Sequence, residues 1–308
     1  MQMTNPLDLR RLRHLKAVLG EGSISAAAAQ LGLSQPALSA SIKSLESDLG
    51  VRLLRRHNLG VESTPSAELL IAHAGQVERE LDAALSALAE LHGRSAASLN
   101  IGCGPAEATR LLPLALTRLR VVHPGVRLFV EYGLNETLMP MVRRGEIVFA
   151  LSSVPRSAAH PELRHDALYM DTAVIVARVG HPLAARRTLT ANDLAAYPWV
   201  LARRWELERK ALDELFAQAG LPPVRAQIET TSAVLMKALL LQSDFLTFVP
   251  HEMVFWEEGA NLLRPLKGVG SMWQRHVGIT TRRDGALPAH AAVLVRLLRE
   301  AAQKIPRS

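Results

Sequence analysis

The sequence predicts an α + α/β fold in three parts, and three observations support this prediction. The first 65 residues contain short amphipathic segments that are separated by helix stops. A continuous heptad pattern follows, and the last two thirds of the chain alternate between strand-like and helix-like runs. The chain has 308 residues, of which 48% are hydrophobic and 21% charged, so it has the composition of a globular protein with several domains.

Composition also limits the function classes. The single cysteine, Cys103, excludes an intramolecular disulfide and a cysteine-based zinc site. The longest apolar runs are shorter than the ~20 residues that a membrane helix needs, and the first residues lack the apolar stretch of a secretory peptide. We therefore expect a cytoplasmic protein that does not engage a membrane. The formal net charge of +7 is compatible with a polyanionic partner.

Three short helices are expected at the N-terminus. Apolar residues recur at helical spacing over residues 9–19, and Ser23 and Ser34 stand where the N-caps of a second and a third helix should be. Gly32 and Gly50 would end these two helices. Two helices joined by so short a turn are typical of a helix-turn-helix, whose second helix enters the major groove of DNA.

The third helix has a polar face that could read DNA. If the apolar residues between 38 and 49 face the core, the opposite face carries Gln35, Pro36, Ser39 and Lys43. Gln35 can pair with an adenine edge and Pro36 can touch a thymine methyl, whereas Ser39 and Lys43 suit phosphate. The alternative is the solvated face of a generic three-helix bundle, which the cap and turn spacing disfavours.

A short hairpin is expected next to this helix. Residues 52–61 combine two strand-like runs with a turn at 58–60. Arg55 and Arg56 place cations on the hairpin, so it is interpreted as a basic wing that holds phosphate.

A single long helix is expected over residues 66–92. Its apolar residues form an a/d seam over about three heptads, which is typical of a helix that pairs with a second copy. The alternative is that the seam packs on the chain's own domain. The seam comprises Leu70, Ala74, Val77, Leu81, Ala84, Leu88 and Leu91.

The remaining 200 or so residues predict a mainly parallel α/β sheet with ligands at the carboxyl ends of its strands. Strands are expected at 99–102, 126–132, 147–152, 173–178, 199–202 and 245–249, and helices at 106–123, 207–220 and 233–241.

Motifs for enzymatic chemistry are missing from the sequence. The turn at residues 102–104 begins like a dinucleotide loop, but Glu107 stands at the position of its last glycine. His251 and Glu252 begin like a zinc helix, yet Phe255 replaces the second histidine. Because no histidine can be positioned beside Cys103, this residue is interpreted as a small lining residue and not as a nucleophile. We expect no enzyme, no cofactor and no metal site.

Several of these motifs together resemble the LysR-type transcriptional regulators of bacteria. The resemblance is densest in residues 22–31 and 34–39, with further matches at Leu45-Glu46 and Leu49-Gly50. It continues more weakly in Leu112-Pro113, His123-Pro124, Gly145-Glu146, His181-Pro182-Leu183 and Pro198-Trp199. The family resemblance implies a winged helix-turn-helix, a dimerising linker helix and a two-lobed effector domain that is similar to periplasmic binding proteins.

The resemblance also implies site residues. The family's DNA contacts fall on Ser34, Gln35, Pro36, Ser39 and Arg56, whereas Ala40 and Leu59 replace positions that are often basic. Its effector cleft falls on Cys103, Gly104, Pro105 and Ala106, opposite Arg203, Thr231 and Ser232. Free N–H groups at a helix start, two hydroxyls and an arginine suit an anion, although Thr231 and Ser232 could instead simply cap the helix that follows.

The sequence therefore predicts a cytoplasmic regulator that binds double-stranded promoter DNA as a homodimer or homotetramer and responds to a small anionic effector. The alternative is a two-lobed solute-binding protein or enzyme whose N-terminal region serves only for assembly. The expected domains are 1–65 for DNA binding, 66–93 for dimerisation and 94–308 for effector binding, with lobe I at about 96–165 and 266–300 and lobe II at about 166–265. The chain is expected to cross between the lobes near His165 and Arg264.

Overall fold

The computed structural model describes residues 7–57, 60–91, 98–155, 160–203, 207–268, 273–285 and 287–305. The chain divides into two compact units, Met1–Ser95 and Ala96–Ser308. Each unit has its own hydrophobic core. In the described part of the chain, no helix is both long and apolar enough to cross a bilayer.

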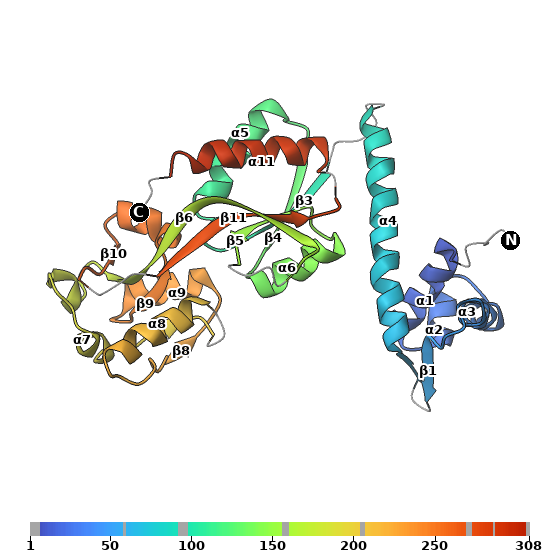
Figure 1. Ribbon diagram of the computed structural model, residues 1–308, viewed down its shortest axis with the longest axis horizontal. Helices are drawn as coiled ribbons and strands as arrows, with labels where there is room; N and C mark the ends of the chain where they lie inside the picture. Colours follow the sequence, from blue (N-terminus) through green and yellow to red (C-terminus); the bar gives the residue numbers. More distant parts are fainter. Residues whose placement is uncertain are drawn as a thin grey trace. The chain divides into compact units, whose positions relative to one another are not determined.

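The N-terminal unit consists of three short helices, a two-stranded hairpin and one long helix (Figure 1). Leu15, Val18, Leu38, Ile42 and Leu45 form the centre of its core and are fully buried. Each of these side chains contributes about 1.5–3 kcal/mol by leaving water. The elements are α1 (Leu9–Glu21), α2 (Ile24–Gln30), α3 (Gln35–Leu49), β1 (Leu54–His57), β2 (Gly60–Ser63) and α4 (Pro65–Leu91).

The predicted caps of the short helices are confirmed. The Ser23 side chain accepts a hydrogen bond from the N–H of Ala26, and the Ser34 side chain accepts one from Ala37, each at 3.4 Å. Gly50 ends α3 in the left-handed conformation with φ of 67°, which glycine adopts without steric cost.

The predicted hairpin wing is present, although residues 58 and 59 of its turn lie outside the described part. Arg55 pairs with Glu62 and Arg56 with Val61 across the two antiparallel strands. The Val61 N–H donates to the carbonyl of Gly22 at 2.9 Å. A Cβ at Gly60 would lie 2.5 Å from that same oxygen, so a glycine is needed where the wing meets the end of α1.

The long helix α4 begins against the short helices and then leaves them. Ala67 and Ala74 are buried, and Leu70 packs partly into the core of the unit. One turn further on, Glu78 pairs with Arg13 at 2.9 Å and with Lys16 at 3.1 Å. Packing on the chain's own domain therefore accounts for the first part of the heptad seam.

The C-terminal unit is an α/β domain with two lobes, each with its own core (Figure 1). Its larger sheet has the strand order β10-β6-β11-β5-β3-β4, with β9 also paired to β6. The elements are β3 (Ser98–Cys103), α5 (Leu111–Val122), β4 (Arg127–Tyr132), α6 (Asn135–Arg144), β5 (Ala150–Ser153), β6 (Leu163–Arg178), the short 3-10 helix η1 (Pro182–Ala185), α7 (Ala191–Ala195), β7 (Val200–Leu201), α8 (Leu207–Gln218), β8 (Ile228–Glu229), α9 (Ala233–Gln242), β9 (Thr247–Pro250), a second 3-10 helix η2 (His251–Val254), α10 (Phe255–Gly259), β10 (Leu263–Pro265), β11 (Gln274–Arg282) and α11 (Ala289–Ala302).

The expectation of a mainly parallel sheet is wrong. Strand β3 pairs in parallel with β4 and β5, and β7 pairs in parallel with β8. Strand β11, however, is antiparallel to β5 and β6, and β6 is antiparallel to β9 and β10. The sheet is mixed because β11, β9 and β10 all run antiparallel to the long strand β6, whereas β3 runs parallel to its neighbours.

The expected lobe crossings near His165 and Arg264 both fall inside strands. His165 lies inside β6 and pairs with Thr280, and Arg264 lies inside β10. The first part of β6 pairs only with β11, whereas from Ala173 onward it pairs with β9 and β10. Strand β6 therefore crosses between the lobes as one continuous strand.

Candidate functional site

The polar face of α3 lies on the surface of the N-terminal unit. Gln35, Pro36 and Lys43 are exposed, and Ser39 is half-buried, while the opposite face of the helix fills the core. Ser34 is exposed and caps the helix through its hydroxyl. The first turn of α3 therefore presents an amide, a proline ring and a hydroxyl together, with the Lys43 ammonium two turns further along the same face.

A carboxylate fixes the wing to this helix. Glu46 Oε1 accepts hydrogen bonds from the backbone N–H groups of Leu53 and Leu54 at 2.7 and 3.1 Å. The bonds set the start of β1 relative to α3. Arg55 on β1 is exposed, whereas the side chain of Arg56 lies outside the described part. Sequence reasoning assigned no such positioning role to Glu46.

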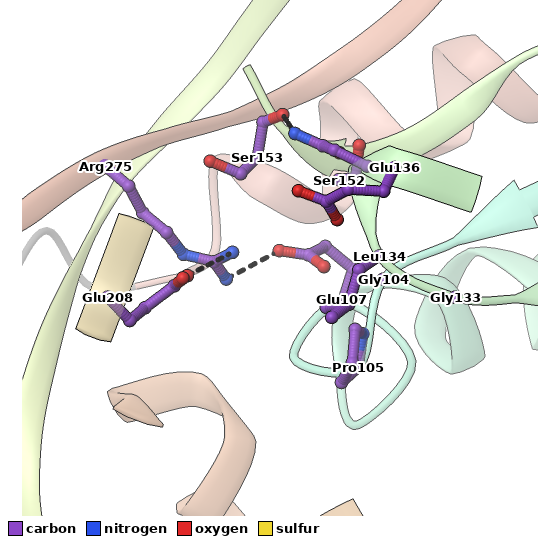
Figure 2. Close-up of a pocket in the computed structure, with 11 residues that line it drawn as sticks. Gly104, Pro105, Glu107, Gly133, Leu134, Glu136, Ser152, Ser153, Glu208 and Arg275 are labelled. Atoms are coloured by element: carbon purple, nitrogen blue, oxygen red, sulfur yellow. Dashed lines mark hydrogen bonds and ion pairs between the residues drawn. The ribbon is translucent and has the colours of Figure 1, made fainter. Parts of the chain in front are cut away.

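A pocket lies where the loop after β3 meets the ends of β4 and β5 (Figure 2). Gly104 and Pro105 form one wall, and Arg275 of β11 and Glu208 of α8 approach from the other side. Its full lining is Gly104, Pro105, Glu107, Gly133, Leu134, Asn135, Glu136, Ser152, Ser153, Glu208 and Arg275.

A buried ionic network forms the wall of this pocket. The Arg275 guanidinium lies 2.7 Å from Glu107 Oε1, 3.0 Å from Asp171 Oδ2 and 4.0 Å from Glu208 Oε1. Burial raises the pKa of the Glu107 carboxyl, and the Arg275 charge opposes that rise. Because Arg275 lies at the start of β11 and Glu208 belongs to α8 of lobe II, the network connects the loop after β3 to lobe II.

Arg203 and Thr231 line an adjoining pocket. The same pocket is also lined by Pro105, Tyr132, Gly133 and Glu136, so it brings together residues that were expected on opposite sides of the cleft. Thr231 also lines a third, more apolar pocket, which includes Pro105, Ala106, Met236 and Phe248. The linings of the three pockets share Pro105 and Leu134, and the three pockets together are called the cleft below.

Other predicted effector residues occupy different places. Cys103 is fully buried, and burial raises the pKa of its thiol well above the usual range. Ser232 is the N-cap of α9, and its side chain accepts a hydrogen bond from the N–H of Leu235 at 3.2 Å. This is the capping role that the sequence offered as the alternative to ligand binding.

The expected helix start at Ala106 is wrong. The helix α5 begins at Leu111, and residues 105–110 form turns in which Glu107 reaches Arg275. The N–H of Gly104 donates to the carbonyl of Leu151 at 2.9 Å, so it continues the sheet. The argument for anion binding by helix-start N–H groups therefore fails here.

Two family models match the chain. The model of the bacterial regulatory helix-turn-helix protein of the lysR family covers residues 9–68, and that of the LysR substrate binding domain covers residues 92–303. The chain belongs to the LysR family of bacterial transcriptional regulators. It therefore combines a DNA-binding helix-turn-helix with an effector-binding domain, and the alternative of a solute-binding protein or enzyme is wrong.

LysR-family relatives match over nearly the full length of the chain. The SDS degradation transcriptional activation protein of Pseudomonas sp. (strain ATCC 19151) is 35% identical over 98% of this chain and 99% of its own. The regulator GbpR of Azospirillum brasilense is 31% identical over 96% of this chain and 86% of its own. The crystal structure of full-length CbnR with its target DNA has the same fold, with a TM-score of 0.68, 21% identity and coverage of 96% and 100%.

The sequence did not reveal most of the charged residues of this cleft. Glu107 drew attention only because it replaces the last glycine of a dinucleotide loop, and Glu208 and Arg275 belong to no motif. Arg275 is separated from Glu107 by 168 positions and from Asp171 by 104. The resemblance led to the loop after β3, but no local pattern signals partners at such distances.

Proposed function

We propose that this LysR-family regulator binds double-stranded promoter DNA in the cytoplasm as a homodimer or homotetramer, and that a small anionic effector in the cleft changes how the DNA is held. The observation that carries the DNA part is the exposed first turn of α3. Gln35, Pro36 and Lys43 project from a helix whose other face is buried, as expected of a recognition helix.

The proposed DNA contacts divide by chemistry. Gln35 and Pro36 would read base edges, whereas Ser34, Ser39, Lys43, Arg55 and Arg56 would hold phosphates. Two features support this division. Glu46 fixes the wing beside α3, and the wing carries exposed Arg55.

The proposed assembly uses the exposed part of α4. Val77, Leu81 and Leu88 are 49%, 44% and 55% exposed, although all three belong to the heptad seam. Ala84 is exposed as well, whereas the Leu91 side chain lies outside the described part. A second copy of α4 would bury this apolar stripe, as in a coiled coil.

The proposed domains follow these parts. Residues 1–65 would bind DNA, residues 66–93 would dimerise and residues 94–308 would bind the effector. The junction at residues 92–97 lies outside the described part of the chain. We propose that the lobe boundary lies near Ala173, where β6 changes its partner, and near Gln274, where β11 begins.

The proposed anionic group of the effector would contact Arg203 and Thr231. Arg203 is exposed and lines a pocket together with the Thr231 hydroxyl. A guanidinium and a hydroxyl are suitable donors for a carboxylate.

A gel shift tests the regulator proposal. The full-length protein should retard the intergenic DNA that adjoins its own gene at concentrations that leave a shuffled duplex of equal length free. Specific binding should be tighter by a factor of about 1,000 or more. Equal retardation of the two duplexes would contradict a role at that promoter.

A further inference from the structure

The pocket of Figure 2, called the inner pocket below, is lined by residues with buried hydrogen-bond acceptors that no described residue satisfies. Glu107 is 1% exposed and Ser152 is 3% exposed, and both line this pocket. Glu107 Oε2, Ser152 Oγ and Asn135 Oδ1 are buried and accept no hydrogen bond from the described residues. Buried polar atoms without a partner are costly, and a ligand is one means of satisfying them.

The orientation of these groups is fixed by their other bonds. Glu107 Oε1 is held by Arg275 at 2.7 Å, and Oε2 lies next to Gly104, 2.3 Å from where a Cβ on that glycine would be. Asn135 Nδ2 donates a hydrogen bond to the carbonyl of Ser153 at 2.8 Å, so Oδ1 is the amide atom without a partner among the described residues. Figure 2 shows the Glu107 carboxylate and the Ser152 side chain next to the same space.

The Arg275 cation already pairs with other oxygens than these acceptors. Arg275 directs its three nitrogens to Glu107, Asp171 and Glu208, at distances of 2.7 to 4.0 Å. The pocket lining carries three carboxylates, from Glu107, Glu136 and Glu208, against this one guanidinium. The inner pocket therefore has a surplus of negative charge and of acceptors, unlike the Arg203 pocket.

We propose that the effector carries a protonated amine that binds in the inner pocket, where its N–H groups donate to Glu107 Oε2, Ser152 Oγ and Asn135 Oδ1. An ammonium group has three N–H donors and a positive charge, which match three acceptors and an acidic wall. This inference rests on the proposed effector function and deepens it. Together with an acid group at Arg203, it describes a small amino acid or amino carboxylate.

Two other occupants fit less well. An anion would meet the carboxylates of Glu107 and Glu136, and the Arg275 guanidinium in the same lining is already paired with Glu107 and Asp171. A metal ion usually requires several ligands, and the described residues contain no group of three histidine, cysteine, aspartate or glutamate side chains that could hold one.

Isosteric ligand pairs test the proposal. The full-length protein would be titrated calorimetrically with β-alanine, γ-aminobutyrate and ε-aminohexanoate, and with butyrate, pentanoate and heptanoate, in which a methyl replaces the ammonium. At least one amine should bind, with an affinity at least about 10-fold above its methyl partner, which is the range of a charged hydrogen bond. Butylamine, which lacks the acid group, separates the two ends of the ligand.

Three variants locate the amine. Glu107→Gln should weaken the best amine by about 10-fold or more, and Ser152→Ala by about 5-fold, because they remove a charged and a neutral acceptor. Glu131→Gln, on an exposed position of β4 outside the pocket lining, should leave the affinity unchanged. If Glu107→Gln fails to fold because Arg275 loses its partner, Ser152→Ala still decides the location.

Each outcome separates this inference from the proposed function. Methyl partners that bind as tightly as the amines, or no binding by any amine, would overturn the inference. An amine affinity that Ser152→Ala leaves unchanged would also overturn it. If butylamine binds as tightly as γ-aminobutyrate, the ammonium pocket stands and the proposed acid contact at Arg203 fails.

Discussion

Gln35 lies in the first turn of α3, where an amide side chain can make two hydrogen bonds to an adenine edge. We predict that Gln35→Ala relaxes base preference at one position of the half-site and costs about 1–3 kcal/mol of discrimination. Fluorescence anisotropy on duplexes with each base at that position measures this. Equal weakening on specific and random duplexes would contradict a base contact.

Lys43 provides the matched control on the same face of α3. Lys43→Ala should weaken all duplexes alike and lower the salt dependence of binding by about one counterion. The pair of variants therefore separates base reading from phosphate holding.

Glu107 should make amine binding depend on pH. Burial raises the pKa of this carboxyl above its usual range, while Arg275 of β11 opposes the rise and Asp171 of β6 and Glu208 of α8 add to it. An ammonium binds the ionised carboxylate, so affinity should fall as pH drops through this raised pKa. Calorimetry at a series of pH values measures the effect, and Glu107→Gln should flatten the profile.

Helix α4 is the element on which the proposed assembly depends. We predict that the double variant Val77→Glu and Leu81→Glu yields monomers that bind promoter DNA poorly, because the seam would bury unpaired charges. The cost is several kcal/mol per interface. Light scattering measures the mass, and His73→Glu, on an exposed position outside the seam, is the control. An unchanged mass of the double variant would show that the copies associate elsewhere.

Local signals made the short helices predictable, whereas long-range partners were invisible. Ser23 and Ser34 act as caps within three residues of themselves, so the sequence pattern is enough to find them. Helix α5 begins at Leu111 and not at Ala106, and in the turns before it Glu107 pairs with Arg275, which is 168 positions away in the chain. The mixed sheet likewise depends on which strands β6 and β11 pair with, and periodicity does not specify a partner.

The cleft links the loop after β3 to both lobes of the effector domain, so occupancy there can bias their arrangement. A Cβ at Gly104 would lie 2.3 Å from Glu107 Oε2. Some ligand of the calorimetric series is expected to bind the wild type and to change its affinity for DNA. We predict that Gly104→Leu abolishes this change, while DNA binding without ligand stays intact. Gly125→Leu is the control, since no atom lies within 4 Å of its Cβ position. A ligand response that survives Gly104→Leu would contradict the cleft assignment.

The central claim is that paired copies of the chain present two α3 helices to one face of promoter DNA, and the spacing between half-sites tests it most directly. Affinity would be measured for the promoter duplex that the protein retards and for versions of it with about five or ten base pairs inserted between the half-sites. One helical turn is about 10.5 base pairs. The account predicts a large loss of affinity with the half-turn insertion and recovery with the full-turn insertion. Equal affinity for all three duplexes would contradict it.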